Sequence, residues 1–367
     1  MPTTKVVVNI ADETPYDVRI GAGQLDALGA RLRGISGATR ALVLTDSTVG
    51  PLYLDALKAS LTAAGFSVSQ IVVPAGETSK SVSCASEIWQ AMAALRLSRD
   101  ALVVALGGGV VGDIAGFTAS TYMRGLDFVQ VPTTLLAMVD ASVGGKTGIN
   151  LDAGKNLVGT FAQPSYVCAA TDTLQTLPAR EWACGCAEIV KAACIDSDDF
   201  FFWLTEHTEA LAARDAAVVE EAIARSVVCK ANIVAADQFE SRGVRECLNY
   251  GHTLGHAIEL LAGYGTYSHG QAVAEGMRFA AELSEAILGA PRDLVAAQND
   301  MLDELGLPSL TFAPSPEKLM AAMGGDKKVR AQQLRFVLLR DVGSWEVVEV
   351  EPAVVLEHLA GWQRSKG

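Results

Sequence analysis

Three of the five histidines in this 367-residue chain fall within residues 249–269. His252 and His256 are four residues apart, so a helix carries both on one face. His269 follows two glycines that would end that helix, so it can return to the same side at the start of the next one. Three imidazoles near one point suggest a divalent metal, and a carboxylate would complete the site.

The histidine pair has an alternative interpretation as hydrogen-bonded core residues. It lacks the internal glutamate of the H-E-x-x-H motif, so the helix carries no general base between its histidines. A candidate carboxylate is Glu188, three residues before Lys191 in an otherwise apolar stretch. The two can form a solvated helix pair, or a metal can balance the acidic group.

Composition restricts the possible partners. The length favours two domains, and a chain that is half hydrophobic can bury a substantial core. A net charge of -13 argues against nucleic acid and anionic membranes as partners. An anionic small substrate would therefore need a local cluster of basic residues.

Seven cysteines without a C-x-x-C pair show no disulfide framework. Cys184 and Cys186 flank a glycine, and we interpret them as small buried thiols rather than as a metal pair. The N-terminus has no basic segment followed by a long apolar core, and no run of 18 apolar residues occurs. These features favour a reduced, cytoplasmic enzyme.

Residues 1–178 alternate short apolar runs with helical stretches, which is typical of an α/β domain with a mostly parallel sheet. Ligands of such sheets bind at the carboxyl ends of the strands. Residues 179–367 are predicted to be mainly helical over 180–323, with a late hairpin at 334–350. The strands expected in the first part are 39–44, 68–74, 101–106 and 128–131, and the helices are 52–64, 80–97 and 110–120.

The strand 101–106 runs into Gly107, Gly108 and Gly109 and then into a helix. Glycines allow the backbone to approach a pyrophosphate closely, and the helix N-terminus offers unpaired N–H groups. The segment matches G-x-G-x-x-G, but it lies too far along the chain for the usual first-turn fingerprint. A tight strand-to-helix turn is the alternative.

Polar residues follow other strands, as a nucleotide spread across the sheet edge requires, although helix N-caps would give the same pattern. They are Asp46, Glu77 with Lys80, and Thr133 with Thr134. A second glycine-rich segment, 139–148, contains Lys146 but does not match the Walker A motif.

Taken together, a series of segments closely resembles the 3-dehydroquinate synthase family, over essentially the full length and in order. The segments are 107–113, 121–125, 131–136, 139–146, 154–156, 187–191, 248–256 and 326–328. The resemblance implies an NAD-binding α/β domain followed by a helical domain with a divalent metal, zinc or cobalt, and an active site in the cleft between them. It implies Glu188, His252 and His269 as metal ligands. His256 then becomes a catalytic residue that does not bind the metal, contrary to the first impression from the spacing.

The resemblance also implies the residues that contact NAD and substrate. Those for NAD are Asp46, Glu77, Lys80, Gly108, Gly109, Gly112, Asp113, Thr133, Thr134, Lys146, Lys155, Thr173 and Thr176. Those for substrate and catalysis are His256, Lys146, Asp140, Lys191, Asn249, Arg245, Lys230, Asn156, Arg124, Lys327 and Lys328. Arg124 resembles an arginine that reaches the phosphate from a neighbouring subunit, which implies a homodimer. The choice between Lys327 and Lys328 stays open.

The implied reaction belongs to the shikimate pathway of aromatic amino acid biosynthesis. It converts 3-deoxy-D-arabino-heptulosonate 7-phosphate to 3-dehydroquinate and phosphate by transient oxidation with NAD, phosphate elimination, re-reduction and aldol closure. The alternatives are another sugar phosphate cyclase, whose substrate lacks the carboxylate, a metal-dependent polyol dehydrogenase, and a catalytically silent nucleotide-binding or assembly protein.

Overall fold

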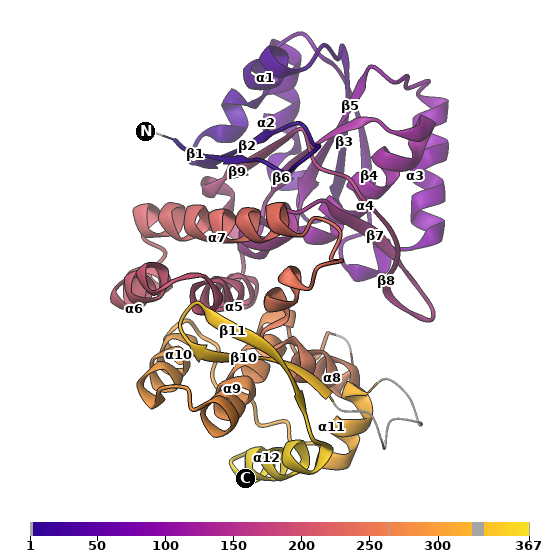
Figure 1. Cartoon of the computed structure of the whole chain (residues 1–367). Helices are drawn as coiled ribbons and strands as arrows, with labels where there is room; N and C mark the ends of the chain where they lie inside the picture. The colour runs from indigo at the N-terminus through magenta and orange to yellow at the C-terminus, as the bar shows by residue number, and fades with distance from the viewer. Residues whose placement is uncertain (1–2, 264, 325–333, 367) are drawn as a thin grey trace. The chain divides into compact units, whose positions relative to one another are not determined.

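The computed structural model describes residues 3–263, 265–324 and 334–366. The chain divides into two compact units (Figure 1). The first unit comprises the residues up to Pro178 together with Ile223–Phe239, and the second comprises Ala179–Ala222 together with the residues from Glu240 onward. The sequence-based division placed all residues after 178 in one domain, whereas by its contacts the segment Ile223–Phe239 groups with the first unit.

The first unit is built on a seven-stranded sheet. Strands β1 and β2 pair antiparallel at one edge, and every other pair in the sheet is parallel. In spatial order the strands are β1 (Thr4–Val8), β2 (Tyr16–Gly21), β9 (Tyr166–Ala170), β6 (Asp127–Pro132), β5 (Ala101–Gly107), β3 (Arg40–Asp46) and β4 (Ser67–Val73).

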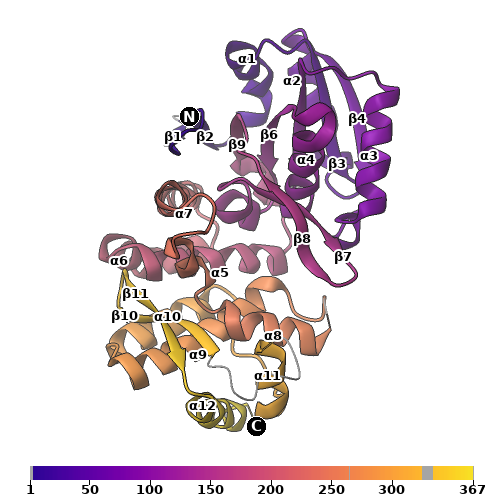
Figure 2. The same ribbon diagram turned by 45° about the vertical axis from the view of Figure 1, so that its right-hand side comes forward.

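Helices cover both faces of this sheet (Figures 1 and 2). Successive residues of a strand point to opposite faces. Accordingly, Leu42 and Leu44 of β3 pack with residues of α3 (Val82–Ala94) and α4 (Gly109–Thr121). Ala41 and Val43 pack with α1 (Gln24–Ile35) and α2 (Gly50–Ala63). All residues of β5 are buried, which explains why this strand is a continuous apolar run.

Each strand and helix expected between residues 39 and 131 is present, with ends that differ by a few residues. The expected fold class is confirmed. The elements β1, β2 and α1 were not predicted from the sequence, and neither was the hairpin of β7 (Lys146–Leu151) and β8 (Gly154–Phe161). Gly148 and Gly159 face each other across that hairpin so closely that a Cβ on Gly159 would lie 2.2 Å from the Thr147 carbonyl oxygen.

The second unit is mainly helical, and the expected hairpin near residues 334–350 is present. Helix α7 begins in this unit and continues into residues that group with the first. The elements are α5 (Ala179–Asp196), α6 (Asp198–Ala212), α7 (Ala216–Ala236), α8 (His252–Ala262), α9 (His269–Leu288), α10 (Arg292–Glu304), α11 (Pro316–Met323), β10 (Leu334–Asp341), β11 (Ser344–Val350) and α12 (Pro352–Arg364).

Glycines allow α5, α8 and α9 to touch backbone to backbone. A Cβ on Gly276 of α9 would lie 1.8 Å from the carbonyl oxygen of Gly251, which precedes α8. A Cβ on Gly270 would lie 2.4 Å from the Cα of Cys184 in α5. Gly251 also has a φ of +79°, a conformation that favours glycine. Helix α9 is therefore held against both the residue that precedes α8 and Cys184 of α5.

None of the described helices combines the length and the apolar character that a membrane span requires.

Candidate active site

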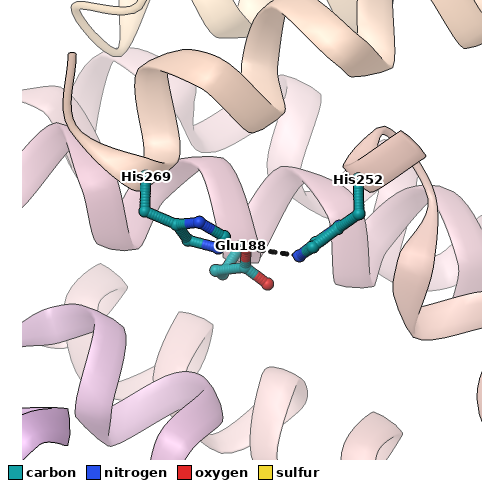
Figure 3. A group of neighbouring side chains, drawn as sticks. All are labelled: Glu188, His252 and His269. Atoms are coloured by element: carbon teal, nitrogen blue, oxygen red, sulfur yellow. Dashed lines mark ion pairs between the residues drawn. The ribbon is translucent and has the colours of Figure 1, made fainter. Parts of the chain in front are cut away.

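Three helices of the second unit each contribute one side chain to a compact group (Figure 3). Glu188 lies in the middle of α5, and His252 and His269 are the first residues of α8 and α9. Ser268 and Gln271 form a capping box at the start of α9, so the backbone at His269 is fixed by reciprocal hydrogen bonds. The ligand atoms that the three side chains offer all lie within 4.8 Å of one another.

The protonation pattern of the two rings suits a metal. Oε1 of Glu188 is buried, has no hydrogen-bond partner among the described residues, and lies 3.6 Å from Nε2 of His269 and 3.9 Å from Nε2 of His252. The Tyr250 carbonyl oxygen lies 3.1 Å from Nδ1 of His252 and can only accept, so that nitrogen donates. Nδ1 of His269 lies 3.4 Å from Oε2 of Glu259. With the proton of each ring held on Nδ1, both Nε2 atoms can offer lone pairs on the Glu188 side to a metal, which would displace any proton from Nε2 of His269.

The residues present thus fit a divalent cation. Two imidazoles and one carboxylate are a donor set of catalytic zinc sites, in which further positions stay open for substrate. The same donors suit cobalt.

Charges around Glu188 perturb the local pKa values. Burial opposes ionisation of Glu188, but the adjacent Lys191 ammonium and the two imidazoles hold its pKa well below the usual value. Burial, followed by the Lys191 charge, lowers the pKa of His252 to about 3. Burial also acts to lower the pKa of His269, but the carboxylates of Glu188 and Glu259 beside its two ring nitrogens outweigh it and raise the pKa to about 9.

His256 takes part in a second, overlapping group with Glu259 and His269 that also has metal-ligand geometry. The ring centroids of His252 and His256 are 5.3 Å apart, and those of His256 and His269 are 6.3 Å apart. His256 is exposed, whereas Glu188 is buried. The structure therefore offers two ligand sets that share His269, and the set with Glu188 is the more buried.

A pocket of about 330 Å³ adjoins these histidines within the second unit. Three residues predicted from the sequence line it: Asn249, His252 and His256. The other lining residues are Glu246, Thr253, Arg335, Val337 and Val347. Thus the predicted residues of 249–256 face one cavity.

Two predicted substrate-binding cations are buried in the second unit. Lys191 forms an ion pair with Oε2 of Glu188, its neighbour one helical turn earlier. Nε of Arg245 lies 3.4 Å from Oε1 of Glu240. Lys327 and Lys328, also predicted to contact substrate, lie outside the described residues.

The predicted nucleotide-binding residues of the first unit follow the carboxyl ends of four strands. Asp46 ends β3, Gly108 and Gly109 follow β5, Thr133 follows β6, and Thr173 follows β9. Three further residues predicted to contact NAD, Gly112, Thr134 and Thr176, lie within the next few residues of the same segments. This is the edge of a parallel sheet where ligands bind.

At the start of α4, glycines leave the backbone without side chains that would cover it. A Cβ on Gly108 would lie 3.1 Å from Cγ2 of Thr134, and one on Gly112 would lie 2.7 Å from Oε1 of Gln130. Gly108 has a φ of −74°, so close approach rather than a left-handed backbone explains the glycine. The α4 N-terminus therefore presents N–H groups without a covering side chain, which suits a pyrophosphate.

Lys80 joins several predicted residues into one network. Its buried Nζ lies 2.6 Å from Oδ2 of Asp113 and 2.5 Å from Oδ1 of Asn156. Glu77 lies 3.8 Å from the same ammonium group. Burial raises the pKa of Asp113, although the Lys80 charge acts in the opposite direction. Asn156 has a φ of +57°, in the left-handed region that asparagine adopts more readily than most residues with a side chain.

Some of the polar side chains at the strand ends bond to the backbone of the turn or helix that follows, close to the alternative interpretation of the sequence. Oδ1 of Asp46 accepts hydrogen bonds from the backbone N–H groups of Thr48 and Val49, at 2.7 and 2.9 Å. Oγ1 of Thr134 accepts from the backbone N–H of Ala137. In contrast, the buried Oγ1 of Thr133 has no hydrogen-bond partner among the described residues. Among Asp46, Thr133 and Thr134, the Thr133 hydroxyl therefore has the greatest need of a hydrogen bond from a bound ligand.

Further predicted residues of the first unit are Asp140, Lys146, Lys155 and Lys230. Nζ of Lys230 donates to both the backbone oxygen and Oδ1 of Asp140, each at 2.7 Å. Asp140 lies in a single π-helical turn, Ala137–Ala141, a feature frequent at functional sites. Lys146 begins β7 and Lys155 lies in β8, and both are exposed.

Cys184 and Cys186 are buried, as interpreted from the sequence. Sγ of Cys184 accepts a hydrogen bond from the backbone N–H of Gly270, and burial raises the pKa of this thiol to about 12. The side chain therefore stays protonated and supports the first turn of α9.

Solved structures with this fold define the class of protein. A 2-deoxy-scyllo-inosose synthase in complex with carbaglucose-6-phosphate, NAD+ and Co2+ has a TM-score of 0.88 and 26% identity, covering 97% of this chain and 99% of that one. A 2-epi-5-epi-valiolone synthase from Streptomyces hygroscopicus, with NAD+ and Zn2+ bound, has a TM-score of 0.86 and 29% identity over 98% and 99% of the two chains. The fold is that of the sugar phosphate cyclases.

Comparison of sequences then gives the family. Residues 70–184 match the model of the 3-dehydroquinate synthase N-terminal domain, and residues 185–329 match that of the C-terminal domain. A 3-dehydroquinate synthase of Xylella fastidiosa is 47% identical over 371 aligned positions, covering 98% of this chain and 92% of the relative. The chain belongs to the 3-dehydroquinate synthase family, and the resemblance found in the sequence is confirmed.

Glu259 and Arg335 lie at the site but were not predicted from the sequence. Glu259 follows His252 by seven residues and His256 by three, so the three share one face of α8. That spacing was a usable signal. No local sequence pattern predicts that Arg335 lines the pocket, because β10 reaches the pocket only in the folded chain.

Proposed function

We propose that the chain converts 3-deoxy-D-arabino-heptulosonate 7-phosphate to 3-dehydroquinate and phosphate, using NAD and one divalent metal ion, zinc or cobalt. Family membership supports the reaction. The observation that carries the metal-dependent part is the buried Oε1 of Glu188 with the Nε2 atoms of His252 and His269 directed toward it. When bound, the metal supplies Lewis acidity toward a substrate hydroxyl, and NAD supplies a reversible hydride acceptor.

The chain's own residues hold the substrate by its two anionic groups. A carboxylate and a phosphate on one molecule require several cations, and an overall charge of -13 makes a local cluster necessary. Lys191 and Arg245 of the second unit, and Lys146 and Lys230 of the first, are assigned to this role, as is Lys327 or Lys328. Asn249 on the pocket wall orients hydroxyl groups by hydrogen bonds.

His256 is assigned to proton transfer. Its imidazole lines the pocket beside His252, and an imidazole exchanges protons readily near neutral pH. A ring nitrogen of His256 takes a proton from the substrate or returns one to it. Asp140 holds the Lys230 ammonium in place for the phosphate.

NAD is assigned to the carboxyl edge of the parallel sheet. The bare start of α4 at Gly108 and Gly109 binds the pyrophosphate, and the buried Thr133 hydroxyl gains a partner from the nucleotide. Asp113, fixed by Lys80, and the Asp46 carboxylate bind the remaining polar groups.

A homodimer is part of the proposal. Met123 and Arg124 are exposed and both have positive φ, at 51° and 69°. Such backbone strain is retained where the surroundings enforce it, as a second copy of the chain would. Large apolar side chains of β8, among them Leu157 and Phe161, are also exposed and supply an apolar surface for that contact. Arg124 then reaches the phosphate of the neighbouring subunit.

A cytoplasmic location is also part of the proposal. The seven cysteines are free, which supports a reducing, cytoplasmic location.

The test is phosphate release from the heptulosonate phosphate with metal present and NAD far below the substrate concentration, while absorbance reports NADH. Many phosphates released per NAD without lasting NADH are expected, because re-reduction returns the cofactor. The absence of phosphate with steady NADH formation on a simple polyol would contradict the proposal and indicate a dehydrogenase. Release of phosphate from a substrate without the carboxylate, but not from the heptulosonate, would indicate another sugar phosphate cyclase.

A further inference from the structure

Glu259 is an acidic residue beside the candidate metal site to which the proposed reaction assigns no role. It lies on α8, on the same face as His252 and His256. Its side chain is only 11% exposed. A carboxylate that is largely removed from water needs a specific partner, because burial of an unpaired charge is costly.

One partner is the ring of His269. Oε2 of Glu259 lies 3.4 Å from Nδ1 of that ring, on the edge opposite the Nε2 that faces Glu188. An imidazole that offers Nε2 to a metal carries its proton on Nδ1, and this N–H requires an acceptor. The Tyr250 carbonyl meets the same requirement for His252. Each candidate histidine ligand therefore has an acceptor of its own behind it.

His269 needs this acceptor more than His252 does. Its side chain is 32% exposed, compared with 12% for His252, so packing restrains its ring less. The capping box fixes the backbone at the start of α9, but it does not fix the ring, whose terminal torsion has two broad minima. A half-turn of the ring would place Cε1 where Nε2 lies and Cδ2 where Nδ1 lies, and so would remove the lone pair from the Glu188 side.

We propose that Glu259 is a positioning residue of the metal site, which holds the His269 ring so that Nε2 faces Glu188. The inference rests on the metal-dependent part of the proposed function. It assigns to Glu259 a hydrogen bond to a ligand rather than a bond to the metal. The rival arrangement is the overlapping group of His256, Glu259 and His269, in which Glu259 would itself be a ligand.

The experiment measures zinc affinity of the full chain by competition with a chromophoric chelator, after the metal has been stripped and restored. Glu259→Ala is expected to weaken zinc binding by about 10- to 100-fold, the usual effect of losing such a partner. Glu259→Gln is expected to restore part of the affinity, because its amide oxygen accepts from Nδ1. Glu285→Gln, which removes a carboxylate of α9 that pairs with the exposed Arg292, is the matched control and is expected to bind as the parent does.

The visible spectrum of the cobalt-loaded protein gives a second readout that does not depend on turnover. Glu259→Ala is expected to change the bands, because the orientation of one ligand changes, whereas Glu285→Gln is expected to leave them unchanged. Should Glu259→Ala fail to fold, Glu259→Met, which retains most of the volume without an acceptor, replaces it in both measurements.

An affinity of the Ala or Met variant within twofold of the parent's, with unchanged bands, would overturn the inference. Loss of zinc by His256→Ala together with its retention by His252→Ala would also overturn it, because Glu259 would then be a ligand. Failure of the parent to bind zinc or cobalt would instead overturn the metal-dependent function itself, and the inference with it.

Discussion

Gly276→Ala tests whether the close contact of α8 and α9 builds the metal site. The added Cβ would lie 1.8 Å from the carbonyl oxygen of Gly251 and 2.9 Å from the backbone nitrogen of Gly255. Both obstacles are backbone atoms, so no side-chain rotation relieves the overlap. A Cβ contact below 3.0 Å is essentially never seen, and α8 must therefore move away by at least about 1.2 Å.

Two opposing effects decide the stability of this variant. Alanine is favoured over glycine inside a helix by about 1 kcal/mol. Overpacking of a well-filled interior costs about 1–3 kcal/mol, and a backbone obstacle places the variant at the upper end. A net loss of roughly 1–2 kcal/mol is expected. The metal site is more sensitive, because ligand distances tolerate only about ±0.2 Å. His252 starts α8 and His269 starts α9, so zinc affinity is expected to fall by at least about tenfold.

The assay combines urea denaturation of the metal-free protein with zinc competition on the folded protein. Gly361→Ala in α12 is the matched control, since a Cβ there meets only Nη2 of Arg364, at 3.8 Å. This control is expected to gain about 0.5–1 kcal/mol from helix propensity and to bind zinc as the parent does. If Gly276→Ala gained stability as the control does and kept the parent's zinc affinity, the reasoning from helix contact to metal geometry would be refuted.

Three further predictions concern the metal and the second unit. His252→Ala is expected to abolish zinc binding and turnover with unchanged far-UV circular dichroism, and a variant that kept its zinc would exclude His252 as a ligand. Chelation is expected to remove activity, which zinc or cobalt restores and magnesium does not, because imidazole donors disfavour magnesium; rescue by magnesium would contradict the donor set. Glu275→Ala leaves the buried ammonium of Lys366 and the indole N–H of Trp362 without their carboxylate, so urea denaturation should show a loss of about 3–5 kcal/mol. Lys366→Ala added to it should recover part of that loss, and a single-variant loss below about 1 kcal/mol would contradict the buried ion pair.

Much of the α/β unit could be predicted, because local composition decides it. The short, continuous apolar run of β5 indicates a strand that is buried on both faces. The glycines after it predict the turn into α4. The hairpin of β7 and β8 escaped prediction because it is rich in glycine and lysine, which have low strand propensity. Its pairing depends on the approach of two glycine backbones.

At the strand ends, the sequence left two interpretations of the same residues. Asp46 caps the turn that leads into α2 and Thr134 caps the helical turn that follows it, whereas the buried hydroxyl of Thr133 has no partner among the described residues. A short polar residue after a strand suits both roles, since a cap and a ligand contact use the same oxygen. Only the positions of the neighbouring N–H groups separate them.

At the metal site, the sequence by itself determined that His252, His256 and Glu259 share one face of a helix, because helical periodicity fixes that relation. The tertiary structure decided that Glu188 of α5 lies opposite the Nε2 atoms of His252 and His269, and that the three candidate ligand atoms fall within one metal's reach. It did so through contacts between backbones at Gly251, Gly270 and Gly276. Such contacts join residues distant in the chain, and no local pattern specifies how closely two helices approach.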